Sequence, residues 1–201
     1  MKKFLLALLV MLVFVTGCSS INQSNNDESS GNTNESQDAT NDQTTTEDSN
    51  ILIAYFSKTG NTEAIAQEIQ SLTNGTLVEI ETVEPYPDSY SETVDIAESE
   101  KEANARPEIS TTVDNMDQYD TIFIGYPIWW HDAPMAVYTF LENYDFEGKT
   151  VIPFCTSGGS DIEESIPGIE AAVSGATMLE GLTANDSSDV QPWLEEIGIL
   201  K

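Results

Sequence analysis

Residues 51–69, ILIAYFSKTGNTEAIAQEI, carry the pattern from which the fold follows. The run Ile51–Phe56 is nearly continuous in apolar side chains, which is typical of a parallel strand covered on both faces. Beyond it, Ile65, Ile69 and Leu72 recur at i, i+4 and i+7, the spacing of one face of an amphipathic helix. A strand that passes through a short polar loop into a helix indicates an α/β sheet.

The same alternation of strand and helix continues to the end of the chain. Further strands are predicted at Leu77–Val83, an edge strand by its apolar–acidic alternation, and at Thr121–Tyr126, Val151–Cys155 and Thr177–Leu182. Further helices are predicted near 88–105, at 134–141 after an early proline, at Asp161–Val173 with a break at Pro167-Gly168, and after Asp189. We therefore predict one doubly wound α/β domain at 51–201 with right-handed crossovers.

The first candidate site is the loop 57–62, Ser-Lys-Thr-Gly-Asn-Thr, which follows the first strand. In open α/β sheets ligands bind beyond the carboxyl ends of the strands. This loop leads into a helix N-terminus, where free N–H groups and the helix dipole attract an anion. It lacks both the GxxxxGK[ST] and the GxGxxG spacing. Its neutral donors predict a monophosphate site, and the structural alternative is a helix start capped by side chains.

Two further loops follow neighbouring strands. Residues 125–132 include two adjacent tryptophans, of which at least one is expected to be exposed and to meet a flat ligand or a partner. The alternative is a tryptophan lid over the following helix. For His131 three roles are left open: a helix cap, a contact with a ligand oxygen, or a side chain that faces solvent. Residues 156–160, Thr-Ser-Gly-Gly-Ser, allow the backbone to approach a ligand edge, or form a flexible turn.

The composition excludes several classes of function. With 35 acidic against 7 basic residues and a net charge of −28, the chain has no clustered Lys and Arg for nucleic acid. One histidine and two cysteines leave no Cys/His zinc cluster. Cys155, at a strand end, is predicted to be a buried structural thiol. Glu98, Glu100, Glu102 and Glu108 are interpreted as a solvated face, with steering of basic partners as the alternative.

Three of these segments together resemble the flavodoxin family, in its branch with a YPIWW-type loop. They are ILIAYFSKTGNTEAIAQEI (51–69), YDTIFIGYPIWWHDAPMAVYTFLE (119–142) and GKTVIPFCTSGGSDIEES (148–165). The resemblance implies a flavodoxin-like fold with five parallel strands in the order 2-1-3-4-5. It also implies non-covalent binding of FMN.

The resemblance further implies which residues would hold FMN. The phosphate would be held by Ser57, Thr59, Gly60, Asn61 and Thr62. The flavin ring would be lined by Pro127, Ile128, Trp129 and Trp130, and its pyrimidine edge by Thr156, Ser157, Gly158 and Gly159. No catalytic residue is assigned, because the flavin carries the redox chemistry.

A second motif offers covalent attachment as an alternative. Residues 174–177, Ser-Gly-Ala-Thr, resemble the site at which extracytoplasmic proteins receive FMN on a threonine. However, Ala171 and Leu179 stand where that pattern has an acid and a hydroxyl residue. Non-covalent binding is therefore the favoured interpretation.

The N-terminal residues predict export. Lys2 and Lys3 precede the apolar run Phe4–Val15, which is too short to span a bilayer comfortably. The run ends in Val-Thr-Gly-Cys18, which resembles the lipobox of bacterial lipoproteins and implies a signal peptide at 1–18 and lipidation of Cys18. An ordinary secretory signal is the alternative. The polar, acidic residues 19–50 are predicted to form a disordered tether.

Together these features predict an FMN-binding electron-transfer protein, anchored by lipid at the extracytoplasmic face of the bacterial cytoplasmic membrane. Its partners would be redox proteins or small electron donors and acceptors, and no nucleic acid. One alternative is an FMN-dependent NAD(P)H:quinone-type reductase, which would need Arg or Lys for the second phosphate of its nicotinamide cofactor. A second alternative is a flavin-free surface binding module.

Overall fold

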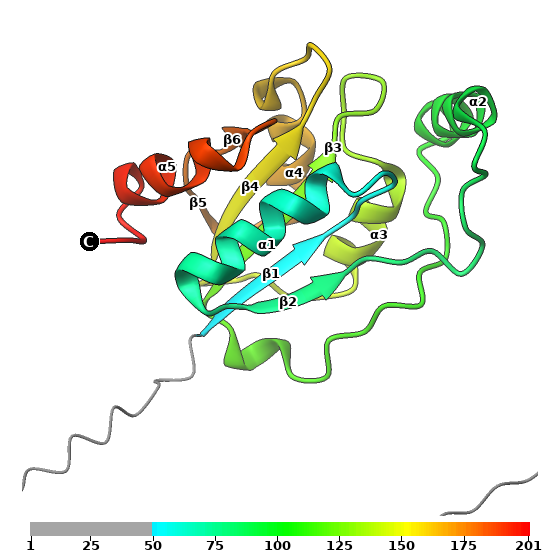
Figure 1. Cartoon of the computed structure of the whole chain (residues 1–201). Coiled ribbons are helices and arrows are strands. Elements are labelled where there is room, and N and C mark those ends of the chain that lie inside the picture. The colour runs from blue at the N-terminus through cyan, green and yellow to red at the C-terminus, as the bar shows by residue number, and fades with distance from the viewer. Residues whose placement is uncertain (1–49) are drawn as a thin grey trace, which may run out of the picture. The chain divides into compact units, whose positions relative to one another are not determined.

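The computed structural model describes residues 50–201, so the predicted signal peptide, Cys18 and nearly all of the predicted tether lie outside the described residues. The described part is built on a parallel sheet in the order β2-β1-β3-β4-β5, which confirms the predicted fold (Figure 1). The strands are β1 (Ile51–Tyr55), β2 (Thr76–Glu79), β3 (Thr121–Pro127), β4 (Thr150–Thr156), β5 (Thr177–Met178) and β6 (Leu182–Thr183), which also pairs with β4.

The central strands are buried on both faces because helices cover each side of the sheet. These helices are α1 (Asn61–Thr73), α3 (Met135–Glu142), α4 (Ile166–Ala172) and α5 (Val190–Glu196). Apolar residues of α1 and α5 pack on the face that carries Ile53 and Phe123. Residues of α3 and α4 pack on the face that carries Leu52 and Ile122. Continuous apolar strands are therefore required, as the sequence pattern predicts.

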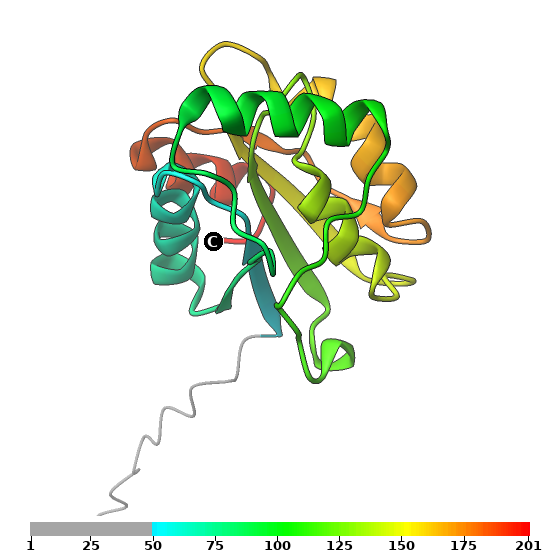
Figure 2. The ribbon, with the colours of Figure 1, turned by 90° about the vertical axis from the view of Figure 1, so that its right-hand side faces the viewer.

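Helix α2 (Tyr90–Glu102) confirms the helix predicted near 88–105 but belongs to neither covering layer. Among its residues, Thr93 and Ala97 are buried. Its first turn is capped by Ser89, whose Oγ accepts from the Glu92 N–H at 3.5 Å. Figure 2 shows α2 lying across the end of the sheet where the loops after β1, β3 and β4 emerge.

The last strand predicted in Thr177–Leu182 is present, but it is divided into two short pieces, β5 and β6. Met178 of β5 pairs with Val151, and Leu182 of β6 pairs with Phe154. Between these two pairs the outer edge advances by four residues and β4 by only three. The extra residue lies opposite Pro153. The residues two positions before and after it, Val151 and Cys155, both accept hydrogen bonds from backbone N–H groups of this outer edge, and Pro153 faces the same edge. Because proline has no N–H to donate there, the ladder is interrupted and the strand is split.

Two other boundaries differ from prediction. The expected helix over Asp161–Val173 is instead a short 3-10 turn at Ile162–Glu164 followed by α4, so the break lies at Ser165 and not at Pro167. Pro167 stands in the first turn of α4, where its missing N–H costs no bond. The expected strand Leu77–Val83 ends at Glu79.

Gly168 permits a close approach between α4 and α3. A β-carbon at this position would lie 2.2 Å from the hydroxyl of Tyr138. A side chain at this position would therefore require Tyr138 to shift. Among residues 50–201, no helix combines the length and the hydropathy needed to cross a membrane.

Candidate functional site

A cleft of about 870 Å³ opens at the carboxyl ends of β1, β3 and β4. This is the end of the sheet where ligands bind in doubly wound folds, and the volume falls in the range of about 300–1,000 Å³ for small-molecule sites. Of the residues predicted to hold FMN, all but Gly60 and Gly159 line the cleft. The structure therefore brings the three predicted loops together.

The loop between β1 and α1 presents donors at one end of the cleft. Helix α1 begins after Gly60, which has φ +83° and no side-chain cap, so the alternative of a helix start capped by a side chain is wrong. The Ser57 hydroxyl accepts from the Gly60 N–H at 3.1 Å and shapes the turn. The N–H groups of Asn61, Thr62 and Glu63 have no acceptor within the helix, so this end attracts an anion.

A buried hydrogen bond joins this loop to the loop after β4. The hydroxyls of Thr62 and Thr156 lie 2.9 Å apart. Both side chains line the cleft, yet both are almost fully buried. A direct side-chain contact therefore joins the first turn of α1 to the end of β4, beside the two loops.

The loop after β4 is held by Asn185, a residue the sequence gives no motif to find. Its Oδ1 accepts from the Ser157 N–H at 2.9 Å, and its Nδ2 donates to the Ser157 carbonyl at 2.7 Å. The Ser157 hydroxyl in turn accepts from the N–H groups of Gly159, at 3.1 Å, and Ser160, at 2.8 Å. The loop is thus an ordered turn.

The two tryptophans after β3 have different surroundings, although both line the cleft. Trp129 is half-buried, with its ring edge-on to Phe56 at 5.4 Å and to Tyr86 at 5.1 Å between centroids. Trp130 is 41% exposed, which confirms that at least one tryptophan is exposed. Its Nε1 donates to the Val94 carbonyl of α2 at 3.1 Å, so this contact is with α2 and not with the following helix α3.

His131, also on the cleft wall, binds side chains near α4. Its Nδ1 lies 2.5 Å from Glu164 Oε2 and 3.2 Å from Ser160 Oγ. Because serine and carboxylate share one ring nitrogen, the three residues lack the geometry of a Ser-His-Glu triad. Cys155 is buried as predicted, and burial raises the pKa of its thiol to about 11, which favours the protonated thiol over the thiolate at neutral pH.

Helix α2 and the turn before it form a cleft wall that sequence reasoning missed. Asp88, Tyr90, Thr93, Val94 and Ala97 line the cleft from this side. The Asp88 carboxylate approaches Lys58 of the loop between β1 and α1, with 3.8 Å between charged atoms. No motif marks this helix, because its sequence is only weakly apolar.

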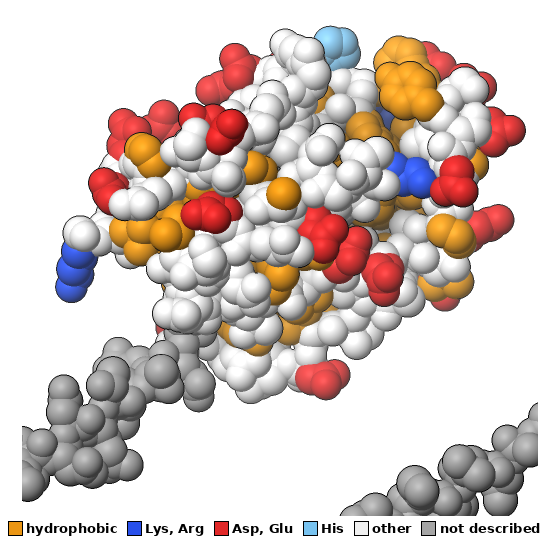
Figure 3. Space-filling view, in the orientation of Figure 1, with side chains coloured by type: hydrophobic (Ala, Val, Ile, Leu, Met, Phe, Trp, Pro, Cys, Tyr) orange, Lys and Arg blue, Asp and Glu red, His pale blue; other side chains and the backbone are white. Residues whose placement is uncertain are grey.

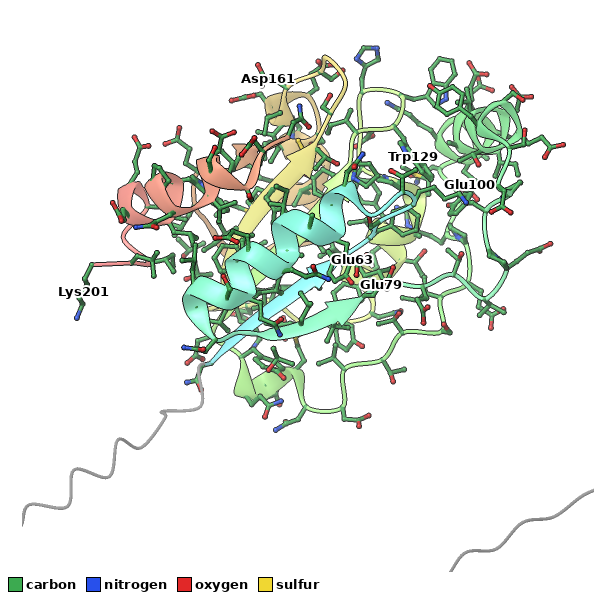
Figure 4. All side chains as sticks on the ribbon, viewed as in Figure 1. Glu63, Glu79, Glu100, Trp129, Asp161 and Lys201 are labelled. Carbon is green, nitrogen blue, oxygen red and sulfur yellow. The ribbon has the colours of Figure 1, made fainter. Side chains whose placement is uncertain are left out.

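Glu100 of α2 contradicts the interpretation of a fully solvated acidic face. Its Oε2 accepts from the Tyr86 hydroxyl at 2.7 Å, and burial raises the pKa of its carboxyl group. It shares a small hollow with Trp129, and the two are labelled in Figure 4. Glu100 therefore supports the cleft wall from behind.

Few cationic side chains surround the cleft. Figure 3 shows acidic side chains spread over the visible face. Among the described residues that line the cleft, Lys58 and His131 are the basic ones. Within 50–201, no group of three or more His, Cys, Asp or Glu side chains is arranged for a metal ion.

The candidate covalent site lies away from the cleft. Thr177 begins β5 and pairs with Thr150 at the amino end of β4, whereas the cleft is at the carboxyl ends of the strands. A flavin attached to Thr177 would start from the opposite end of the sheet. This placement favours the non-covalent interpretation.

Comparisons with known proteins agree with this architecture. A solved structure assigned as a flavoprotein of Bacteroides eggerthii is 36% identical, with a TM-score of 0.68, over 75% of this chain and 98% of that one. A similarly assigned protein of Bacteroides uniformis is 33% identical, with a TM-score of 0.67, over 73% and 98%. A flavoprotein of Lactobacillus acidophilus, solved in complex with FMN, is 29% identical, with a TM-score of 0.59, over 71% and 97%.

The search of curated proteins found no match. The family model described as Flavodoxin matches residues 50–197, nearly the whole of the described part. Together with the strand order and the position of the cleft, this match leads to one conclusion: the chain belongs to the flavodoxin family.

Proposed function

We propose that this protein binds FMN non-covalently in the cleft and transfers electrons between redox partners. The observation that carries the proposal is the meeting, in one cleft, of an uncapped helix N-terminus, two tryptophans and the Gly-rich loop after β4. The FMN complex of the Lactobacillus acidophilus relative supports the choice of cofactor. FMN supplies the redox chemistry, and the protein's part is to bind and orient it.

The donors at the phosphate end fit a dianion held without cations. The hydroxyls of Ser57, Thr59 and Thr62 and the first N–H groups of α1 surround one end of the cleft. Charge-assisted hydrogen bonds to such a phosphate are about twice as strong as neutral ones. Lys58 is already paired with Asp88, so neutral donors would hold most of the phosphate charge.

The tryptophan wall fits a planar ring. We assign Trp130 to the ring face, because its Nε1 is held by α2 while much of its side chain remains exposed at the cleft. Trp129 is fixed by edge-on contacts with Phe56 and Tyr86, which makes it a support of this wall. The N–H groups and hydroxyls of the loop 156–159 would bind the polar edge of the ring.

The cationic side chains of Lys101 and Arg106 already have partners within the protein, which favours electron transfer over NAD(P)H oxidation. Lys101 binds the Trp130 carbonyl and lies 3.7 Å from Asp132, and Arg106 forms a two-point pair with Glu142 at 2.8 and 2.6 Å. A second cofactor phosphate would therefore compete with existing partners. The FMN-loaded protein is expected to oxidise NADH and NADPH no faster than free FMN, and faster steady-state oxidation would favour the reductase.

The proposed location is the extracytoplasmic face of the cytoplasmic membrane, with the domain anchored through lipidated Cys18. This proposal rests on the apolar run Phe4–Val15 and the lipobox-like residues 15–18. Two or more acyl chains give stable anchoring, whereas one is marginal. The partners would be redox proteins or small electron donors and acceptors.

The flavin site is tested by titrating FMN with the purified full chain and following flavin fluorescence. Quenching is expected on binding, and Trp130→Ala should weaken FMN by about 1–3 kcal/mol, or about 5- to 150-fold. Trp129→Ala should instead lower the free energy of unfolding by about 3 kcal/mol, the low end for a buried aromatic.

Trp193→Phe is the matched control, because Trp193 is buried under the opposite face of the sheet. It should leave FMN affinity unchanged. Full affinity and quenching in both Trp129→Ala and Trp130→Ala would show that this wall does not contact the flavin. A wild-type chain that binds no FMN would favour the flavin-free binding module.

A further inference from the structure

The turn that carries Trp130 has an unfavourable backbone. Trp130 and His131 have φ values of 52° and 64°, in the left-handed region that costs about 1–2 kcal/mol for each residue other than glycine. The turn is closed by the Trp129 N–H to the Asp132 carbonyl at 2.8 Å and by the reverse bond at 3.0 Å. Turns with two left-handed residues ordinarily use Asn and Gly. Contacts from outside the turn must therefore hold it.

Lys101, in the last turn of α2, supplies one of these contacts and is bonded to the backbone of the turn itself. Its Nζ donates to the Trp130 carbonyl and lies 3.7 Å from Asp132 Oδ2. On the other side of the turn, the Tyr138 hydroxyl of α3 donates to Asp132 Oδ1 at 2.5 Å. The same Asp132 oxygen accepts from the Ala133 N–H at 2.8 Å. Lys101 is thus the cation that joins α2 to both the backbone and the carboxylate of the turn.

Lys101 acts from behind the wall. It is absent from the residues that line the cleft, and it lies instead in a small hollow with Trp129, Glu100 and Pro134. Its influence on a ligand therefore passes through the turn and not through direct contact. A charge-assisted bond to a strained carbonyl favours one conformation of the turn over its alternatives.

We propose that Lys101 is a positioning residue, which holds the Trp129–Asp132 turn in its left-handed conformation and thereby sets the affinity of the cleft for the flavin ring. The proposal rests on the proposed FMN site. When a binding-competent conformation is only partly populated, apparent affinity falls in proportion to its population. Loss of Lys101 should therefore weaken every ligand that uses the ring wall, with or without a phosphate.

The first measurement needs no flavin. The three tryptophans of the full chain are labelled with 5-fluorotryptophan and assigned by single Trp→Phe variants. In Lys101→Met, which keeps an apolar stem and loses the charge, the fluorine resonances of Trp129 and Trp130 should shift or broaden. The resonance of Trp193, on the other side of the sheet, should not move.

The second measurement is affinity. Lys101→Met should bind FMN and riboflavin alike about tenfold more weakly, because the ring wall and not the phosphate loop is disturbed. Lys101→Arg, which keeps a cationic donor, should recover most of this affinity. Lys149→Met is the matched control, since Lys149 also donates to two backbone carbonyls, of Met116 and Tyr119, but at the amino end of the sheet.

Four outcomes would overturn the proposal. They are unmoved Trp129 and Trp130 resonances in Lys101→Met, unchanged flavin affinity in that variant, no recovery in Lys101→Arg, and an equal loss of affinity in Lys149→Met. If the wild-type chain binds neither flavin, the proposed function fails. The fluorine spectra still decide whether Lys101 holds the turn, so the two failures are distinguishable.

Discussion

Replacing both Thr62 and Thr156 by valine should cost less stability than the two single replacements added together. Their hydroxyls lie 2.9 Å apart and the residues are 1% and 7% exposed. Each single variant removes the bond and leaves the other hydroxyl buried without it, at a cost of about 1–3 kcal/mol. The double variant replaces both hydroxyls with methyl groups of the same shape, which is nearly neutral. The expected coupling is therefore at least about 2 kcal/mol, the sum of the two smallest single costs.

Urea denaturation of the full chain without flavin measures the four free energies of unfolding in this cycle. In thermal melts, each single variant should lose roughly 2–12 °C, from about 2–4 °C per kcal/mol for a domain of this size. Thr73→Val is the control, because Thr73 lies at the far end of α1 and bonds the Ile69 carbonyl. Its effect should add to that of Thr156→Val. Simple additivity of Thr62→Val and Thr156→Val would refute the buried bond between the loops.

The same variants separate the two ends of the proposed FMN site. Thr62→Val removes a hydroxyl at the phosphate end, so it should weaken FMN more than riboflavin. Thr156→Val disturbs the loop assigned to the ring edge and should weaken both ligands alike. Isothermal titration with the two flavins gives both ratios. A stronger preference for FMN in Thr62→Val would contradict this assignment.

Three further outcomes are expected. Thr59→Ala should weaken FMN by about 10- to 150-fold through loss of a charge-assisted bond of about 1.5–3 kcal/mol, with much less loss for riboflavin, and equal losses in titration would refute it. Burial raises the pKa of Glu100 above 4.5. The folded state therefore holds this proton more tightly, and wild-type stability relative to Glu100→Gln should fall as pH rises through that raised pKa; a constant difference in urea melts would contradict this. Cys18→Ala should release the protein from membranes or block its processing, and unchanged retention with normal maturation in cell fractions would exclude the lipid anchor.

The sheet could be predicted because burial on two faces leaves a direct trace in the sequence. The apolar runs in β1, β3 and β4 are continuous because helices cover both sides of these strands. The loops after the strands could be assigned to one site because parallel strands end at one edge. Local pattern and strand direction were sufficient for these predictions.

Two of the failed predictions depended on a partner elsewhere in the chain. The split between β5 and β6 follows from Pro153, on a neighbouring strand, which removes a donor from the ladder. The acidic residue Glu100 is half-buried because Tyr86 and Trp129 lie beside it. Neither contact produces a hydrophobic periodicity or a sequence motif, so neither could be predicted from the residues themselves.

The sequence alone therefore establishes the α/β class, the positions of the three central strands and the residue types in the loops, since each follows from local spacing and composition. Tertiary structure adds the second wall of the cleft, formed by α2. It also adds the hydrogen bond from Lys101 to the Trp130 carbonyl. A further tertiary contact is the pair of hydrogen bonds between Asn185 and the backbone of Ser157, in the loop after β4. The physical reason is that these contacts join residues about 30 positions apart in the sequence, and their geometry exists only once the sheet has brought the loops to a common edge.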